Sequence, residues 1–196
     1  MTSTIVSADE ALNQLMEGNQ RFVTEKMKHP HEDKDYRLSL SGGQNPFAVI
    51  LACADSRVTP EILFDQGLGD LFVIRVAGNV AKEKVIGSIE YAVAHLGVRL
   101  VMVLGHQNCG AVNASIGVAE FSKNLQAIID EIKPAVYMAK KNGEKDLLNN
   151  AVRINAQLVA AKLAESQPTL HEAVEKENLK IVPAYYELES GKVEIL

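Results

Sequence analysis

The chain has 196 residues, of which 47% are hydrophobic and 23% are charged, and its formal net charge is −5 at pH 7. This length suits one soluble α/β domain with a substantial core and is short for two domains. The mild acidity and scattered basic residues argue against a nucleic-acid partner. No apolar run reaches the roughly 20 residues of a membrane-spanning helix, so no membrane association is expected.

Residues 1–46 are predicted to form a helical arm and a linker. Ser7, followed three residues later by Glu10, is a capping-box pattern, and apolar residues recur at helical spacing over about 8–24. Residues 25–46 are polar and are predicted to be a loop. The arm could pack on its own domain or embrace a second subunit. The chain starts without the basic-then-apolar order of a signal peptide, which predicts a cytoplasmic protein.

Residues 47–196 are predicted to complete a single domain as its α/β core. Apolar runs of strand length at 47–52, 71–76 and 100–104 alternate with helical patterns, which predicts a mostly parallel sheet flanked by helices. If the chain turns back after the second strand, the strand order is 2-1-3 and a ligand site forms between the ends of the first and third strands.

The C-terminal part of the chain is predicted to add helices and an edge strand. Helical stretches are expected over 120–141, 145–165 and 168–177. The runs at 180–187 and 192–195 predict a strand and its hairpin partner, and Pro183 favours an edge position or a bulge.

Chemically reactive side chains follow the first and third predicted strands. Cys53 and the pair Asp55 and Arg57 follow the first strand, and His106 and Cys109 follow the third. Two thiolates and one imidazole with one open position are the ligand set of a catalytic zinc site. Each residue alone has a plainer explanation, as a buried thiol or a turn histidine. A redox pair of the two cysteines is the rival interpretation, but it gives the other three residues no role.

Asp55 and Arg57 are spaced so that their side chains face the same way in an extended chain. A carboxylate paired with a guanidinium is held in one rotamer and kept ionised. Beside a metal, this carboxylate could occupy the fourth coordination position or accept a hydrogen bond from the water there. The alternative is a salt bridge that only ties down the loop.

The segment C-A-D-S-R at 53–57, with H-Q-N-C at 106–109, resembles the β-class carbonic anhydrases, whose pattern is Cys-x-Asp-x-Arg followed by His-x-x-Cys. The similarity continues through GDLFVIRVAGN at 69–79, GSIEYAVAHLGV at 87–98 and AYYELESGKVEIL at 184–196. It implies one Zn²⁺ per chain, held by Cys53, His106 and Cys109. It also implies a lyase that reversibly hydrates CO₂ to bicarbonate and a proton, with zinc-bound hydroxide oriented by the catalytic dyad of Asp55 and Arg57.

The resemblance further implies a substrate pocket. Gln44 matches the family glutamine that hydrogen-bonds bicarbonate, and Phe72, Ala77 and Tyr91 match positions that line the apolar CO₂ pocket. Gly110 would offer its backbone N–H to a substrate oxygen.

Two departures from the pattern indicate a subgroup. Ile50 stands where the bicarbonate-inhibited subgroup has tryptophan, and Ala52 replaces glycine. The chain therefore resembles the always-open subgroup, in which water is the fourth ligand and Asp55 binds zinc only in a closed state.

The resemblance implies a homodimer or a dimer-based tetramer that acts on a small molecule. Two alternatives to CO₂ hydration remain open. One is hydrolysis of carbonyl sulfide or carbon disulfide at the same zinc site, and the other is a non-catalytic zinc or redox module.

Overall fold

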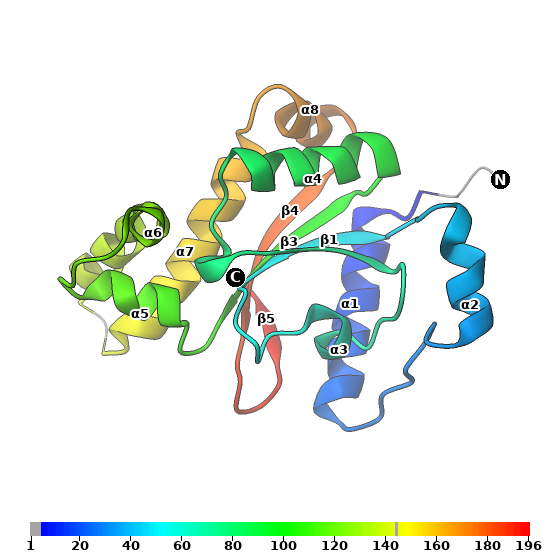
Figure 1. The fold of residues 1–196 in the computed structure, drawn as a ribbon, viewed down its shortest axis with the longest axis horizontal. Coiled ribbons are helices and arrows are strands. Elements are labelled where there is room, and N and C mark those ends of the chain that lie inside the picture. Colours follow the sequence, from blue (N-terminus) through cyan, green and yellow to red (C-terminus); the bar gives the residue numbers. More distant parts are fainter. Residues whose placement is uncertain (1–4, 144) are drawn as a thin grey trace.

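A five-stranded sheet in the order β2-β1-β3-β4-β5 forms the centre of the computed structural model, which describes residues 5–143 and 145–196 (Figure 1). The parallel strands are β1 (Ala48–Ala52), β2 (Leu71–Arg75), β3 (Leu100–His106) and β4 (Lys180–Tyr186), and β5 (Val193–Ile195) runs antiparallel to β4. The predicted mostly parallel sheet, its 2-1-3 order and its C-terminal edge strand are confirmed.

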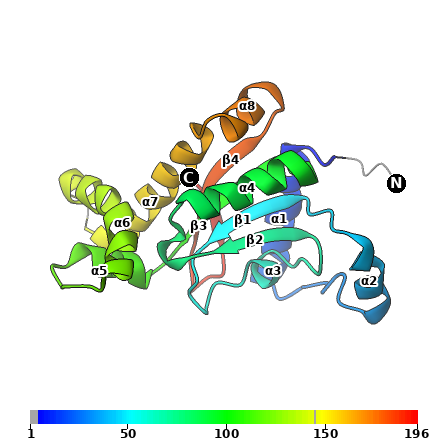
Figure 2. The ribbon, with the colours of Figure 1, turned by 45° about the horizontal axis from the view of Figure 1, so that its top comes forward.

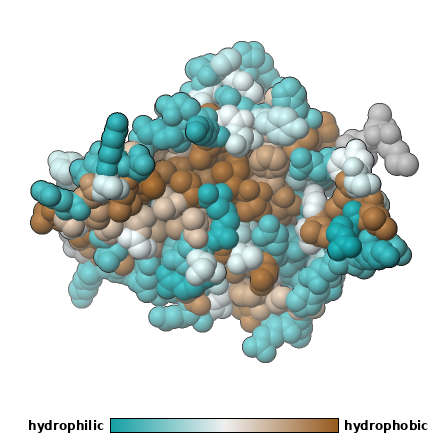
Figure 3. Space-filling model, viewed as in Figure 1, coloured by the Kyte–Doolittle hydropathy of each residue, from teal (hydrophilic) through white to brown (hydrophobic). Residues whose placement is uncertain are grey.

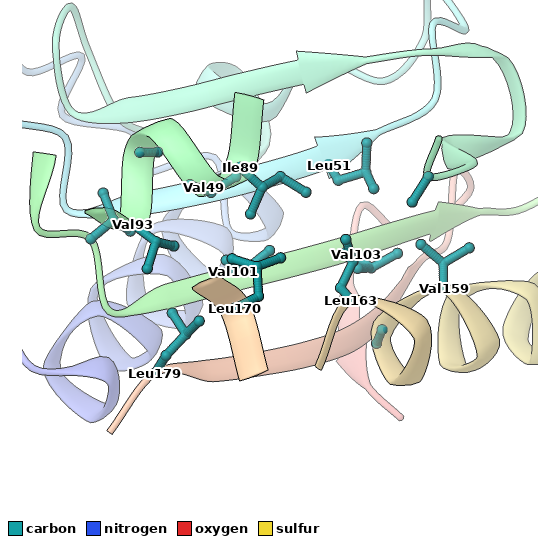
Figure 4. Close-up of a cluster of buried hydrophobic side chains, with 14 of the residues drawn as sticks. Val49, Leu51, Ile89, Val93, Val101, Val103, Val159, Leu163, Leu170 and Leu179 are labelled. Carbon is teal, nitrogen blue, oxygen red and sulfur yellow. The ribbon is translucent and has the colours of Figure 1, made fainter. Parts of the chain in front are cut away.

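Helices cover both faces of the sheet, which explains why β1 is apolar throughout and β3 is apolar up to its last residue, His106. Side chains of Val49, Leu51, Val101 and Val103 meet the helices of one face, α4 (Glu83–Leu96), α7 (Leu147–Ala164) and α8 (Thr169–Lys176) (Figure 4). The alternate residues Ile50, Met102 and Leu104 meet α1 (Ala8–Val23) and α3 (Pro60–Leu63) on the other face. Figure 2 shows α4 and α1 on opposite sides of the sheet.

The N-terminal helix packs on its own domain. Ser7 and Glu10 form the predicted capping box at the start of α1, and Ala11 and Leu15 are fully buried against the sheet. The loop predicted over 25–46 is corrected, because α2 (Lys34–Ser39) and the 3₁₀ turn η1 (Leu40–Gly42) lie within it. The Asp33 side chain caps α2, but α2 buries no residue, so it has no apolar periodicity to recognise.

Asp65, which follows α3, anchors the segment after α1. Its buried carboxylate accepts hydrogen bonds from Arg21 of α1 and from the backbone N–H groups of Lys28 and His29. Burial alone would raise the pKa of this carboxyl, but the guanidinium and the two N–H groups outweigh it, and the pKa lies below its usual value.

Pro183 lies in β4 on the side that faces β5. Its carbonyl accepts a hydrogen bond from the backbone N–H of Leu196, just beyond β5. Since the N and the carbonyl of a strand residue point to the same side, the missing proline N–H costs no bond to β3. The predicted edge position or bulge is therefore corrected: β4 lies between β3 and β5, and its register with β3 is continuous through Pro183.

The remaining helices flank the carboxyl ends of β1 and β3. They are α5 (Gly110–Ile116) and α6 (Lys123–Asn142), and the 3₁₀ turn η2 (Ala77–Asn79) follows β2. In Figure 1, α5, α6 and part of α7 extend to one side of the sheet. Within the described residues, no helix is both long enough and apolar enough to cross a bilayer.

Candidate metal centre

Three potential metal ligands converge where β1 and β3 end. Cys53 directly follows β1, His106 is the last residue of β3, and Cys109 precedes α5. One ligand atom from each residue lies within 4.8 Å of the others, and the two Sγ atoms are 3.9 Å apart. All three side chains are buried. Two segments more than 50 residues apart thus meet because β1 and β3 are neighbours in the sheet.

The imidazole of His106 has one partnered and one unpartnered nitrogen. Its Nδ1 lies 3.0 Å from the carbonyl oxygen of Gln107, so Nδ1 carries the proton and Nε2 keeps its lone pair. Nε2 is buried without a hydrogen-bond partner, as is one other described side-chain atom, Asn79 Nδ2. An unsatisfied buried acceptor costs about 1–3 kcal/mol, and a cation at this point would satisfy it.

The two thiols stabilise one negative charge between them. The pKa of Cys53 is lowered because the Cys109 thiol donates to its sulfur, and further because the Gly78 N–H lies 3.3 Å from that sulfur. The pKa of Cys109 is raised because its hydrogen bond to Cys53 and its burial both disfavour a second charge. The second thiolate therefore requires a cation, and the donor set of two sulfurs and one imidazole nitrogen fits Zn²⁺.

Asp55 and Arg57 form a two-pronged ion pair beside this cluster. Arg57 Nε donates to Asp55 Oδ1 at 2.9 Å, and Nη2 donates to Oδ2 at 2.8 Å. The Arg57 hydrogen bonds hold the pKa of the Asp55 carboxyl well below its usual value, so it is ionised at neutral pH. Asp55 Oδ2 lies 3.8 Å from Nε2 of His106. The carboxylate therefore borders the site with a fixed orientation.

Arg75, which the sequence analysis did not single out, supports the loop that carries Cys53 and Asp55. It is the last residue of β2 and lies opposite Ala52 in the sheet. Its guanidinium donates to the backbone carbonyls of Cys53, at 3.1 Å, and of Asp55. The signal available in the sequence was a charged residue at the carboxyl end of an otherwise apolar strand.

Two residues of the predicted substrate pocket lie beside the cluster. Ala77 begins η2, and the next residue, Gly78, contacts the Cys53 sulfur. Gly110 follows Cys109 and is exposed. Both are at the carboxyl end of the parallel strands, where the ligands are.

The other three predicted pocket residues lie toward the opposite end of the sheet within one chain. Gln44 is exposed and precedes β1, whose five residues span about 16 Å. Phe72 is level with the start of β1. The ring of Tyr91, which is 48% exposed, lies 6.3 Å from that of Phe72. A single chain therefore does not bring these three residues together with the three ligands.

Comparisons with known proteins agree on one family. Residues 48–193 match the family described as carbonic anhydrase. The chain is similar to "Carbonic anhydrase 2" of Mycobacterium tuberculosis, with 41% identity over 91% of this chain and 87% of that protein. It is also similar to the carbonic anhydrase of Mycolicibacterium smegmatis, with 39% identity over 92% of this chain and 89% of that protein.

Solved structures show the same fold. The β-carbonic anhydrase of Coccomyxa, solved with acetazolamide, is 27% identical, with a TM-score of 0.75 over 94% of this chain and 86% of that one. A β-carbonic anhydrase of Sordaria macrospora, from a report on two tetrameric enzymes, has a TM-score of 0.76 at 24% identity over 94% of this chain and 96% of that one.

Proposed function

The chain belongs to the β-class carbonic anhydrase family, a family of zinc lyases, and on this premise we propose that it reversibly hydrates CO₂ to bicarbonate and a proton. The observation that carries the proposal is the buried cluster of Cys53, His106 and Cys109, in which Nε2 of His106 has no partner. The relatives named above do not favour carbonyl sulfide, carbon disulfide or a non-catalytic role.

The three clustered residues would hold one Zn²⁺ per chain. When bound, zinc lowers the pKa of a water molecule toward neutrality. The ionised carboxylate of Asp55, held by Arg57, would accept a hydrogen bond from the attacking water and direct its lone pair at CO₂. The exposed N–H of Gly110 would donate to a substrate oxygen.

The arrangement of Asp55 supports the open form of the site. Both carboxylate oxygens accept hydrogen bonds from Arg57, and Asp55 lies outside the group of mutually close ligand atoms. We propose that Asp55 remains paired with Arg57 in the active enzyme and becomes a fourth ligand only in a closed state.

A second copy of the chain would complete the substrate pocket. The exposed surface of 10582 Å² exceeds the roughly 9,100 Å² of a compact monomer of 21.3 kDa. A broad apolar band crosses the face of the molecule that carries β2 and α4 (Figure 3), and in the described part of the chain no strand pairs with the outer edge of β2.

Antiparallel pairing of two β2 edges about a two-fold axis would place the amino end of one β2 beside the carboxyl end of the other. Gln44, Phe72 and Tyr91 of one subunit would then face the cluster of its partner. The tetrameric assembly of the Sordaria enzymes is consistent with such a dimer as the building block.

The proposed function is tested by measuring metal content and CO₂ hydration on the same sample. We expect one zinc per chain and hydration in a stopped-flow assay, both lost with a chelator and restored by Zn²⁺. Carbon disulfide turnover in place of CO₂ hydration would identify the alternative hydrolase. Stoichiometric zinc with no turnover of either substrate would show a non-catalytic module.

A further inference from the structure

A buried asparagine of α7 reaches the turn that borders the metal centre. Asn155 is 2% exposed, and its Nδ2 donates to the backbone carbonyl of Gly78 at 2.9 Å. An asparagine in the middle of a helix and in the core lowers helix propensity and carries a desolvation cost. Its hydrogen bond to Gly78 offsets that cost and ties η2 to α7.

Gly78, which Asn155 holds in place, also contacts the sulfur of the proposed metal ligand Cys53. Its backbone N–H lies 3.3 Å from Cys53 Sγ, and its φ of +68° is in the left-handed region. A Cβ at this position would lie 2.6 Å from Cδ1 of Ile132, so the turn is closely packed. The position of Gly78, and with it the direction of the N–H toward sulfur, depends on the anchor that Asn155 provides.

A second asparagine of α7 holds the other ligand-bearing turn. Asn149, in the first turn of α7, accepts a hydrogen bond from the backbone N–H of Asn108 at 2.9 Å. Its own Nδ2 donates to Asp146 at 2.8 Å, which fixes the orientation of the amide. Asn108 has a φ of +55° and lies between His106 and Cys109. The amide of Asn149 thus stabilises the turn that separates these two ligands.

We propose that Asn155 and Asn149 are positioning residues for the metal centre. They act through Gly78 and Asn108 and hold, from one helix, the two turns that direct the ligand atoms at a common point. The inference rests on the proposed zinc site and adds to it the support that keeps the ligands in place. Removal of the Asn155 amide would release the turn at Gly78, and removal of the Asn149 amide would release the turn at Asn108. Either change would weaken zinc binding.

A purely structural role for these asparagines predicts a different outcome. If they only satisfy backbone groups, their removal lowers thermal stability but leaves the folded site as it was. If they position the ligands, their removal also changes zinc affinity and the electronic spectrum of the metal–thiolate bonds. An N–H donor to a ligating sulfur alters that spectrum directly.

The test compares Asn155→Ala, Asn149→Ala and the matched control Asn150→Ala. Asn150 is the neighbour of Asn149 on α7, and its side chain makes no hydrogen bond within the described part of the chain. The dissociation constant for Zn²⁺ is measured by competition with a chromophoric chelator, and the thiolate-to-metal absorption band is recorded after substitution with Co²⁺. We expect affinity to fall about 10- to 100-fold in the first two variants. The absorption band should shift in Asn155→Ala, and the control should match the wild type.

Each outcome decides between the explanations. Wild-type zinc affinity and an unchanged Co²⁺ spectrum in both variants would overturn the inference, even if their melting temperatures fall. If Asn155→Ala does not fold, Asn149→Ala, at a half-buried position near the helix start, decides alone. A wild-type protein that binds no zinc would refute the proposed function instead, so the two failures are distinguishable.

Discussion

At the scale of single residues, the site is defined by which polar atoms have partners. Nε2 of His106 has none, whereas both oxygens of Asp55 accept hydrogen bonds from Arg57. The unpartnered nitrogen of His106 is suited to bind a cation. The paired carboxylate of Asp55 is suited to keep a fixed orientation beside that cation. This difference separates the proposed ligands from the proposed catalytic pair.

Asp55→Asn should keep zinc and lose most of the hydration rate. The amide retains the size of the carboxylate, but it loses the charge and one of the two acceptors that Arg57 holds. We expect kcat for CO₂ hydration to fall on the order of 100-fold. Asp130→Asn, an exposed aspartate of α6 paired with Lys133, is the control. Full activity in Asp55→Asn would remove this carboxylate from the mechanism.

The sequence predicted the convergence of Cys53, His106 and Cys109 because each lies at or just past the end of an apolar strand. It did not indicate Arg75, Asn149 or Asn155. An arginine or asparagine outside a motif resembles any other polar residue until the register of the sheet or the face of a helix places it. These three side chains act on backbone groups, and only Arg75, a charged residue at the end of an apolar strand, left a signal in the sequence.

At the scale of secondary structure elements, Asp65 ties the N-terminal helix and the following segment to α3. One carboxylate accepts hydrogen bonds from α1 and from two backbone N–H groups of the segment that follows it. The sequence predicted α1 from its capping box and apolar spacing. It could not predict α2, which buries nothing and is only six residues long.

Asp65→Asn should destabilise the protein by about 3 kcal/mol, because it leaves Arg21 without its buried partner. The pKa of Asp65 is lower in the folded state than its usual value, so its stabilisation is present above about pH 4 and is lost as the pH falls through the folded-state pKa. Urea unfolding of both proteins at several pH values measures this.

The difference between the wild type and Asp65→Asn should therefore shrink under acid conditions. Asp9→Asn is the control, because the exposed ion pair of Asp9 with Lys180 is worth less than about 1 kcal/mol. Equal unfolding free energies of the wild type and Asp65→Asn at neutral pH would show that this anchor does not stabilise the fold.

At the scale of the whole molecule, the proposed metal ligands and three of the five predicted pocket residues lie at different ends of the sheet. The family resemblance assigned Gln44, Phe72 and Tyr91 to the pocket, but a sequence does not say from which subunit a residue comes. Only the topology shows that these residues lie beside the starts of β1 and β2, away from Cys53. In the proposed dimer, the partner subunit bridges this separation.

Two weakened variants should therefore restore each other's activity when they are coexpressed. In a mixed dimer of Gln44→Ala and Asp55→Asn, the Gln44→Ala chain has an intact Asp55 and receives Gln44 from its partner. Random pairing gives half mixed dimers with one complete site each, so we expect about a quarter of the wild-type rate. Sedimentation should give a mass of at least twice 21.3 kDa. A coexpressed sample no faster than the average of the two variants would place Gln44 in the site of its own chain.

The position of Pro183 has a consequence for how the sheet can be extended. Beyond the end of β5, the edge of β4 is exposed at Pro183, whose ring nitrogen has no N–H to donate. A further strand that paired with β4 there would therefore lack one backbone hydrogen bond. The outer rim of β2 carries no proline in Leu71–Arg75 and offers an unbroken row. The opposite flank consists of the three residues of β5 and this interrupted stretch of β4, so β2 offers the longer row, and pairing of two β2 edges gives a closed pair.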